Sequence, residues 1–133
     1  MSLLREPTRP RVRLFVWLGY WVFLFVIMHT LGVGTGLPRL HHSDKVGHFL
    51  FYALLTTLGA WRLSTPNTRA GTVLLWTWAA VYIAYGALDE YLQQFVGRDM
   101  DFYDWLADVA GVTVATLLIA LRRRRLSEPG SAV

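Results

Sequence analysis

Cysteine is absent from the 133 residues, and charged side chains make up only 17% of them. Without cysteine the chain has no disulfide framework, no thiol nucleophile and no thiolate metal site. The shortage of charge is unusual for a water-soluble domain, in which charged residues are about a quarter of the chain. The basic residues lie in short stretches beside apolar runs and form no extended basic face, so the net charge of +4 does not predict nucleic-acid binding.

Apolar side chains take the place of the missing charge. Hydrophobic residues are 54% of the chain, with six Trp, six Tyr and seven Phe. A domain of this size cannot bury so many large apolar side chains away from water. The composition therefore predicts a membrane protein.

Four apolar runs approach the length of about 20 residues that a helix needs to cross a bilayer. Backbone polar groups that face lipid must be paired within their own segment, so each run is expected to be helical. The predicted fold is an all-α membrane bundle of four transmembrane helices, at about residues 14–35, 45–63, 70–92 and 101–121. A basic N-terminal tail, 1–13, precedes this domain of 14–121, and a poorly ordered basic tail, 122–133, follows it.

The basic residues predict the orientation of these spans. Four crossings place ten arginines on one side, namely Arg5, Arg9, Arg11, Arg13, Arg62, Arg69, Arg122, Arg123, Arg124 and Arg125. Arg39, Lys45 and Arg98 fall on the other side. Since basic residues accumulate in cytoplasmic loops, both termini are expected in the cytoplasm.

Most acidic residues lie toward the opposite, outer side, where orientation does not require them. They are Asp44, Asp89, Glu90, Asp99, Asp101, Asp104 and Asp108. Helical spacing brings many of them onto shared faces with other polar residues. The second span presents Lys45, His48 and Tyr52 on one face, and the third presents Asp89 and Gln93, with Glu90 and Gln94 beside them.

In the fourth span the acidic stripe of Asp101, Asp104 and Asp108 continues into Gly111 and Ala115. A pair of small residues four apart allows a neighbouring helix to approach closely. We therefore expect this face, acids included, to point into the bundle. Ionisable residues within a membrane usually pair with one another or serve a function.

The stretches "DKVGHFLFYALL" from Asp44 and "DEYLQQFVGRDMDFYDWLADVAG" from Asp89 resemble the VanZ-like family of small bacterial membrane proteins. The resemblance covers most of residues 40–120. Its matching positions are Asp44, Lys45, His48, Phe49, Tyr52, Glu90, Gln93 or Gln94, Arg98, Asp104 and Gly111. The chain departs from the pattern at Asp108, where the family usually has Asn. The family is named for a protein that raises resistance to teicoplanin, so the resemblance implies a role in the cell envelope.

These residues define a candidate site on the outer side. His48, Glu90 and Asp104 are the candidate catalytic residues, because an imidazole with carboxylate partners can transfer protons. Lys45 and Arg98 suit an anionic headgroup. The candidate ligand-binding residues are Asp44, Lys45, Tyr52, Asp89, Gln93, Gln94, Arg98, Asp101, Trp105 and Asp108.

Several other interpretations stay open. The charges could form an interhelical ion-pair cluster, with Asp44 paired to His48 and Glu90 to Arg98. A metal site could use His48, Glu90, Asp104 and Asp108, with His41 or His42. No spacing motif supports one, so no metal and no cofactor are assigned. Ser43 stands between His42 and Asp44, but triad members meet in space rather than in sequence. His29 is interpreted as a histidine satisfied between helices.

The expected function is the binding or modification of an amphipathic cell-envelope lipid or lipid-linked molecule, which would affect susceptibility to teicoplanin-like glycopeptides. The sequence leaves open whether the site is catalytic. The alternative is a non-catalytic subunit of a larger membrane complex, and a homo-oligomer is also compatible. The expected location is the bacterial cytoplasmic membrane, with the polar site toward the periplasm or cell exterior.

Overall fold

The computed structural model describes residues 10–30, 41–63 and 68–126, without the side chains of 41–43. Its elements are α1 (Pro10–Thr30), α2 (His41–Leu63), α3 (Arg69–Gln93), the short 3-10 helix η1 (Gln94–Val96) and α4 (Phe102–Arg125). Every regular element in these three ranges is a helix, which confirms the all-α prediction. Parts of three predicted segments lie outside the described residues. They are 1–9 of the N-terminal tail (1–13), 31–35 of the first span (14–35) and 127–133 of the C-terminal tail (122–133).

Three helix ends differ from the sequence prediction by four residues, and one of them is the start of α2, which lies at His41 instead of 45. α1 begins at Pro10, because proline is well tolerated in the first turn of a helix. α4 continues through Arg125, so Arg122–Arg125 form its last turn rather than the start of a tail. Arginine is a good helix former, and its positive charge interacts favourably with the C-terminal end of the helix dipole.

Within the described residues, three helical stretches are long and apolar enough to cross a membrane: Pro10–Thr30, Arg69–Val96 and Phe102–Arg125. α2 has a comparable length of 23 residues. It carries Asp44 and Lys45 near its first turn and Arg62 near its last, and it is not among these three. The described chain thus has the helices of a membrane protein.

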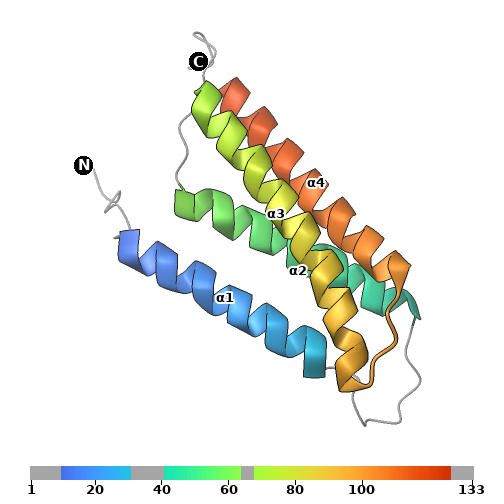
Figure 1. The fold of residues 1–133 in the computed structure, drawn as a ribbon. Coiled ribbons are helices and arrows are strands. Elements are labelled where there is room, and N and C mark those ends of the chain that lie inside the picture. The colour runs from blue at the N-terminus through green and yellow to red at the C-terminus, as the bar shows by residue number, and fades with distance from the viewer. Residues whose placement is uncertain (1–9, 31–40, 64–67, 127–133) are drawn as a thin grey trace.

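The helices are arranged as an irregular bundle (Figure 1). α3 and α4 run antiparallel and side by side. α2 packs across α4, and these two helices share the most extensive contact of any helix pair in the bundle. α1 lies along α2 on the side away from α4. The end of α1, the start of α2, the end of α3 and the start of α4 gather at one end of the molecule.

Gly111 explains the close packing of α2 on α4. A side-chain carbon at Gly111 would collide with the carbonyl oxygen of Phe49 and lie 3.2 Å from the backbone nitrogen of Ala53. Ala115, one turn later, is also buried. The small-residue face predicted from the sequence therefore points into the bundle, as expected for close helix pairs in membranes.

Aromatic residues fill the space between α1 and α3. The ring of Trp17 packs edge-on against Trp78, with centroids 5.2 Å apart, and Trp21 packs against Tyr85 at 4.4 Å. Tyr82 belongs to the same buried cluster. Edge-to-face pairs of this kind add to the stabilisation that comes from area burial alone.

A short turn joins α3 to α4 and positions the polar residues between them. Gly97 ends η1 with φ of 79°, a left-handed conformation that favours glycine. Asp101 then caps α4, accepting a hydrogen bond from the backbone nitrogen of Tyr103 at 2.8 Å. This is the usual way to satisfy a free N–H at a helix start.

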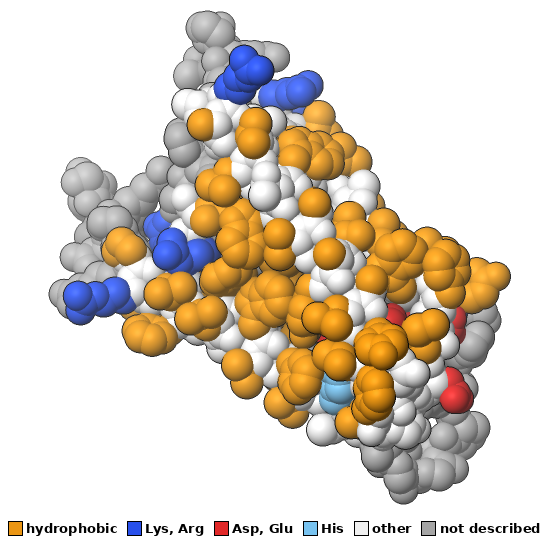
Figure 2. Space-filling view, viewed as in Figure 1, with side chains coloured by type: hydrophobic (Ala, Val, Ile, Leu, Met, Phe, Trp, Pro, Cys, Tyr) orange, Lys and Arg blue, Asp and Glu red, His pale blue; other side chains and the backbone are white. Residues whose placement is uncertain are grey.

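The surface separates by side-chain type (Figure 2). Apolar side chains cover the middle of the visible face, Lys and Arg gather toward one side, and Asp and Glu are visible at the opposite end. Large apolar residues are well exposed on several helices, for example Phe15, Val22, Val73 and Leu118. An apolar surface of this extent is typical of a membrane or protein interface.

Candidate functional site

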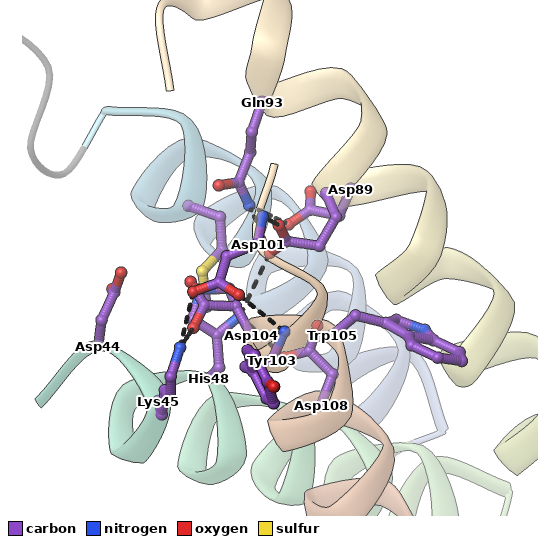
Figure 3. A network of polar contacts seen from close by, with 12 residues as sticks. Asp44, Lys45, His48, Asp89, Gln93, Asp101, Tyr103, Asp104, Trp105 and Asp108 are labelled. Carbon is purple, nitrogen blue, oxygen red and sulfur yellow. Dashed lines mark hydrogen bonds and ion pairs between the residues drawn. The ribbon is translucent and has the colours of Figure 1, made fainter. Parts of the chain in front are cut away.

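The candidate site lies at the end of the bundle where α2, α3 and α4 meet near the end of α1 (Figures 1 and 3). α2 contributes the face with Lys45, His48 and Tyr52, as the sequence predicts. α3 contributes Asp89, Glu90 and Gln93, and α4 contributes its acidic stripe. A buried polar cluster contributed by three helices stabilises their packing only if its side chains are hydrogen-bonded or ion-paired.

His48 is the centre of this cluster, and three carboxylates surround it. Its Nδ1 atom lies 2.9 Å from Oδ1 of Asp108 and 3.8 Å from Oε1 of Glu90. Its Nε2 atom lies 3.9 Å from Oδ2 of Asp104. All four side chains are buried. One imidazole therefore bridges an acid of α3 and two acids of α4.

Lys45 binds two acids at the start of α4. Its Nζ atom donates to Oδ2 of Asp101 at 2.8 Å and to Oδ1 of Asp104 at 2.7 Å. It also lies 5.7 Å from the centre of the Tyr103 ring. Asp101 in turn donates its backbone N–H to Oε2 of Glu90 at 3.1 Å. Lys45 thus links α2 to the N-terminal end of α4.

Asp89 and Gln93 form a second group on α3. Nε2 of Gln93 donates to Oδ2 of Asp89 and to Oε1 of Glu90, both at 3.3 Å. The Tyr85 hydroxyl donates to Oδ1 of Asp89 at 3.4 Å, and Nδ1 of His29 lies 3.6 Å from the same oxygen. His29 therefore faces α3 from α1, as predicted, but it is not satisfied there: its Nδ1 atom lies 2.8 Å from the carbonyl oxygen of Phe25 in its own helix, and its buried Nε2 atom has no hydrogen-bond partner among the described residues.

Arg98 connects the turn before α4 to α1. Its Nη1 atom donates to the carbonyl oxygen of Met28 at 2.6 Å, and its Nη2 atom lies 3.5 Å from Oδ2 of Asp44. The contact with Met28 was not predicted from the sequence, because it uses a backbone carbonyl. The carbonyls of a last helical turn lack partners in their own helix, and this general rule is the signal that could have indicated it.

The pairings differ from those predicted for an ion-pair cluster. His48 contacts Asp108, Glu90 and Asp104, whereas Asp44 was the expected partner. Arg98 contacts Asp44, whereas Glu90 was expected. Helical spacing gives the face on which a residue lies, but the crossing of the helices decides which residue of the neighbouring helix it meets.

A pocket of about 230 Å³ opens beside this cluster between α3 and α4. It is lined by Ala87, Glu90, Met100, Asp101, Phe102 and Trp105. Its lining is mainly apolar, with the two acids joining it to the polar cluster. The indole nitrogen of Trp105 donates to the carbonyl oxygen of Ile83 at 3.2 Å, which fixes the ring at the pocket.

The structure brings together most of the residues predicted for the site, but Gln94 lies apart. Gln94 is exposed in η1, and its side chain bonds to the carbonyl oxygen of Tyr91. The change from α-helix to the tighter 3-10 helix alters the direction of side chains at this point. The side chains of His41, His42 and Ser43 lie outside the described residues.

The cluster is rich in acid. Two cationic side chains, Lys45 and Arg98, and two histidines, His29 and His48, face six acids. These acids are Asp44, Asp89, Glu90, Asp101, Asp104 and Asp108. Two sets of three residues have ligand atoms within 4.8 Å of one another: Asp44, His48 and Asp104, and also His48, Glu90 and Asp108. Such an arrangement can move protons between carboxylates through an imidazole, or hold a cation.

Comparison with known proteins finds one informative similarity. The chain is 33% identical over 114 residues to the uncharacterized protein C11E3.10 of Schizosaccharomyces pombe, an alignment that covers 84% of this chain and 67% of that protein. No family model matches the chain. No solved structure gives a significant match to it.

Proposed function

The chain belongs to the same family as the fungal protein C11E3.10, and on the evidence of its own pocket and helices we propose that it is a four-span membrane protein that binds an amphipathic lipid or lipid-linked molecule. The observation that carries the proposal is the apolar pocket whose lining includes two acids of the buried polar cluster. An apolar wall beside a few fixed polar groups is the usual form of a small-molecule site.

The pocket suits a ligand with an apolar tail and a polar head. Met100, Phe102 and Trp105 offer apolar and aromatic surface, while Glu90 and Asp101 are hydrogen-bond acceptors. The head is therefore expected to carry hydroxyl or amine donors. Lys45, which is one quarter exposed beside Asp101, can meet a phosphate on the same head.

The proposed orientation has four crossings, with both termini in the cytoplasm and the polar cluster outside. α2 is long enough to be the fourth crossing, and its charged residues lie near its two ends. Long basic side chains near a span end can extend to the interface, which accommodates Arg62. With four crossings, the arginines at the start of α1 and the end of α4 fall on the cytoplasmic side.

The resemblance to the VanZ-like pattern supplies the cellular part of the proposal. His48, Glu90, Arg98 and Asp104 are among its matching positions, and each lies in the buried cluster. We place the protein in the cytoplasmic membrane of a bacterium, where its ligand is an envelope lipid and its action changes susceptibility to teicoplanin-like glycopeptides.

A second candidate function is that of a non-catalytic subunit that docks a larger membrane complex. Aromatic residues near the polar end are well exposed, namely Tyr91, Phe95, Phe102 and Tyr103. Lys45 and Arg98 are engaged within the chain itself. Cationic side chains that are engaged within the chain, beneath an exposed aromatic rim, favour a protein partner over an anionic ligand.

The two functions are separated by four substitutions made singly: His48→Ala, Glu90→Gln, Arg98→Ala and Asp104→Asn. Glu90 lines the pocket, so Glu90→Gln removes a charged contact worth about 1.5–3 kcal/mol, and co-purified lipid is expected to fall about tenfold or more. The other three substitutions remove contacts that hold the cluster beside the pocket, and they are expected to lower co-purified lipid in the same direction. Teicoplanin susceptibility is expected to change in parallel. Lipid mass spectrometry and growth inhibition are the measurements.

The matched control is Gln94→Ala, because Gln94 is polar and exposed but lies apart from the cluster. Each variant must first insert at the wild-type level. Wild-type lipid content and susceptibility in all four variants would exclude the lipid site. Unchanged lipid together with loss of a co-purifying membrane protein would favour the docking subunit.

A further inference from the structure

Three side chains from three helices meet at one buried point: His48 of α2, Glu90 of α3 and Asp108 of α4. One ligand atom of each lies within 4.8 Å of the other two. Nδ1 of His48 is 2.9 Å from Asp108 and 3.8 Å from Glu90. Ligands held about 2.0–2.2 Å from one ion lie roughly this far apart, so small side-chain movements suffice to place an ion between them.

The charges at this point are unbalanced. Among the described residues, Glu90 and Asp108 each form an ion pair within 4.0 Å with His48. Lys45 is directed to Asp101 and Asp104, and Arg98 to Asp44 and the Met28 carbonyl. Two buried carboxylates therefore share one imidazole. Buried charges are normally paired or coordinate a metal, because removing them from water is costly.

A second and independent observation is the presence of buried polar atoms without hydrogen-bond partners. Such atoms occur at several places in the described residues, and two of them lie at this point: Oδ2 of Asp108 and the Tyr52 hydroxyl, both on fully buried side chains. A side-chain carbon at Gly86 would lie 3.0 Å from Oδ2 of Asp108 and 3.4 Å from Cε1 of Tyr52, so the Tyr52 ring lies beside the Asp108 carboxylate. Since more than nine-tenths of buried polar groups in proteins are satisfied, two such atoms beside the same carboxylate cluster indicate a ligand.

We propose that His48, Glu90 and Asp108 hold a divalent transition-metal ion of the Mn²⁺ to Zn²⁺ series. Imidazole and carboxylate ligands suit these ions, and two carboxylates neutralise a double positive charge. His48 coordinates through Nδ1, and Nε2 is directed toward Asp104 at 3.9 Å. A carboxylate behind a coordinating histidine orients the ring and raises its basicity.

This site differs from the expectation of no metal, and the reason lies in where its ligands come from. Each helix supplies one ligand, so the chain has no short motif such as two histidines four residues apart. The helices of a bundle commonly build metal sites in this way, with inward-facing side chains from facing helices. The metal site shares Glu90 with the lipid pocket, but metal binding can be measured without lipid, and Asp108→Asn tests the metal site at a residue outside the pocket lining.

The test uses the full chain in a non-ionic detergent, with any affinity tag removed and metals stripped by a chelator. The protein is dialysed separately against Mn²⁺, Zn²⁺, Co²⁺ and Mg²⁺, and bound metal is measured by elemental mass spectrometry. We expect about one Mn²⁺, Zn²⁺ or Co²⁺ per chain. Mg²⁺ is expected to bind more weakly, because it prefers oxygen ligands alone and keeps several waters.

The variants Glu90→Gln and Asp108→Asn change little in shape and each remove one charged ligand. Their affinity is expected to fall at least about 100-fold, since loss of a mere supporting residue already costs 10–100-fold. Asp104→Asn removes such a supporting residue, so its expected loss is about tenfold. The matched control is Asp99→Asn, an exposed acid between the same helices, which is expected to bind metal like wild type.

Wild-type protein that retains none of the three transition ions would overturn the proposal, whatever the variants do. Equal loss in Asp99→Asn and Asp108→Asn would also overturn it, as would wild-type binding by both Glu90→Gln and Asp108→Asn. Circular dichroism checks that each variant keeps its helices. If the variants do not fold, a visible spectrum of Co²⁺ that stays that of the aqueous ion in the presence of wild type still overturns the proposal, because coordination by protein ligands would shift it.

Discussion

Replacing Gly111 with valine is expected to destabilise the bundle by about 3 kcal/mol, at the upper end of the cost of overpacking a close-packed core. The added carbons would collide with the backbone of α2 at Phe49 and Ala53, and backbone cannot rotate away as a side chain can. α2 and α4 must therefore separate along the face that also holds His48 and Asp108. The measurement is the loss of helicity on titration with a denaturing detergent.

The matched control is Gly19→Val on α1. A side-chain carbon at Gly19 meets nothing within 4 Å, so its effect is expected to stay close to zero. The difference between the two variants then reports the close approach of α2 and α4 and removes the general effect of exchanging glycine for valine in a helix. Equal stability of the two variants would contradict the described packing.

Replacing Lys45 with methionine is expected to cost about 2–3 kcal/mol. The change keeps most of the side-chain length but leaves Asp101 and Asp104 without their ammonium donor at 2.8 and 2.7 Å. Breaking a buried ion pair typically costs about 3–5 kcal/mol, and the partial exposure of Lys45 lowers this value. Denaturing titration of helicity is again the measurement.

A double-mutant cycle separates the ion pair from simple loss of packing. Asp104→Asn in the Lys45→Met background removes the buried charge that the first change leaves alone. The double variant is therefore expected to be more stable than the sum of the two single effects predicts, by about 1 kcal/mol or more. Strict additivity would mean that Lys45 and Asp104 do not interact.

The sequence predicts which residues face the bundle, but it does not predict which residues of the neighbouring helices they contact. The spacing of Lys45, His48 and Tyr52 placed them on one face of α2, and Gly111 with Ala115 identified the packed face of α4; the structure agrees on both. These features repeat with the period of a helix, so they can be read from a single segment.

The partners depend on helix crossing and could not be predicted in this way. His48 meets Asp108 instead of Asp44, and Arg98 meets a carbonyl at the end of α1. Gln94 illustrates a related limit, because the change from α-helix to 3-10 helix after Gln93 turns it out of the cluster. The pocket beside Glu90 and Asp101 forms between α3 and α4, and neither helix reveals it alone.

Four membrane crossings with the polar cluster outside would bring all of the proposed features together in one orientation. Because the chain has no cysteine, single cysteines can be introduced without background. The positions are Ser2, Ala70, Asp99 and Leu126, which represent the N-terminus, the start of α3, the turn before α4 and the end of α4. A membrane-impermeant maleimide is applied to intact cells and then to permeabilised cells.

We predict that Asp99→Cys is labelled in intact cells, and that Ser2→Cys, Ala70→Cys and Leu126→Cys are labelled only after permeabilisation. Labelling of both Ser2→Cys and Asp99→Cys in intact cells would mean that α2 does not cross the membrane, which contradicts the four-span account. Labelling of the other three positions but not of Asp99→Cys would place the acidic cluster in the cytoplasm and contradict an outward-facing site.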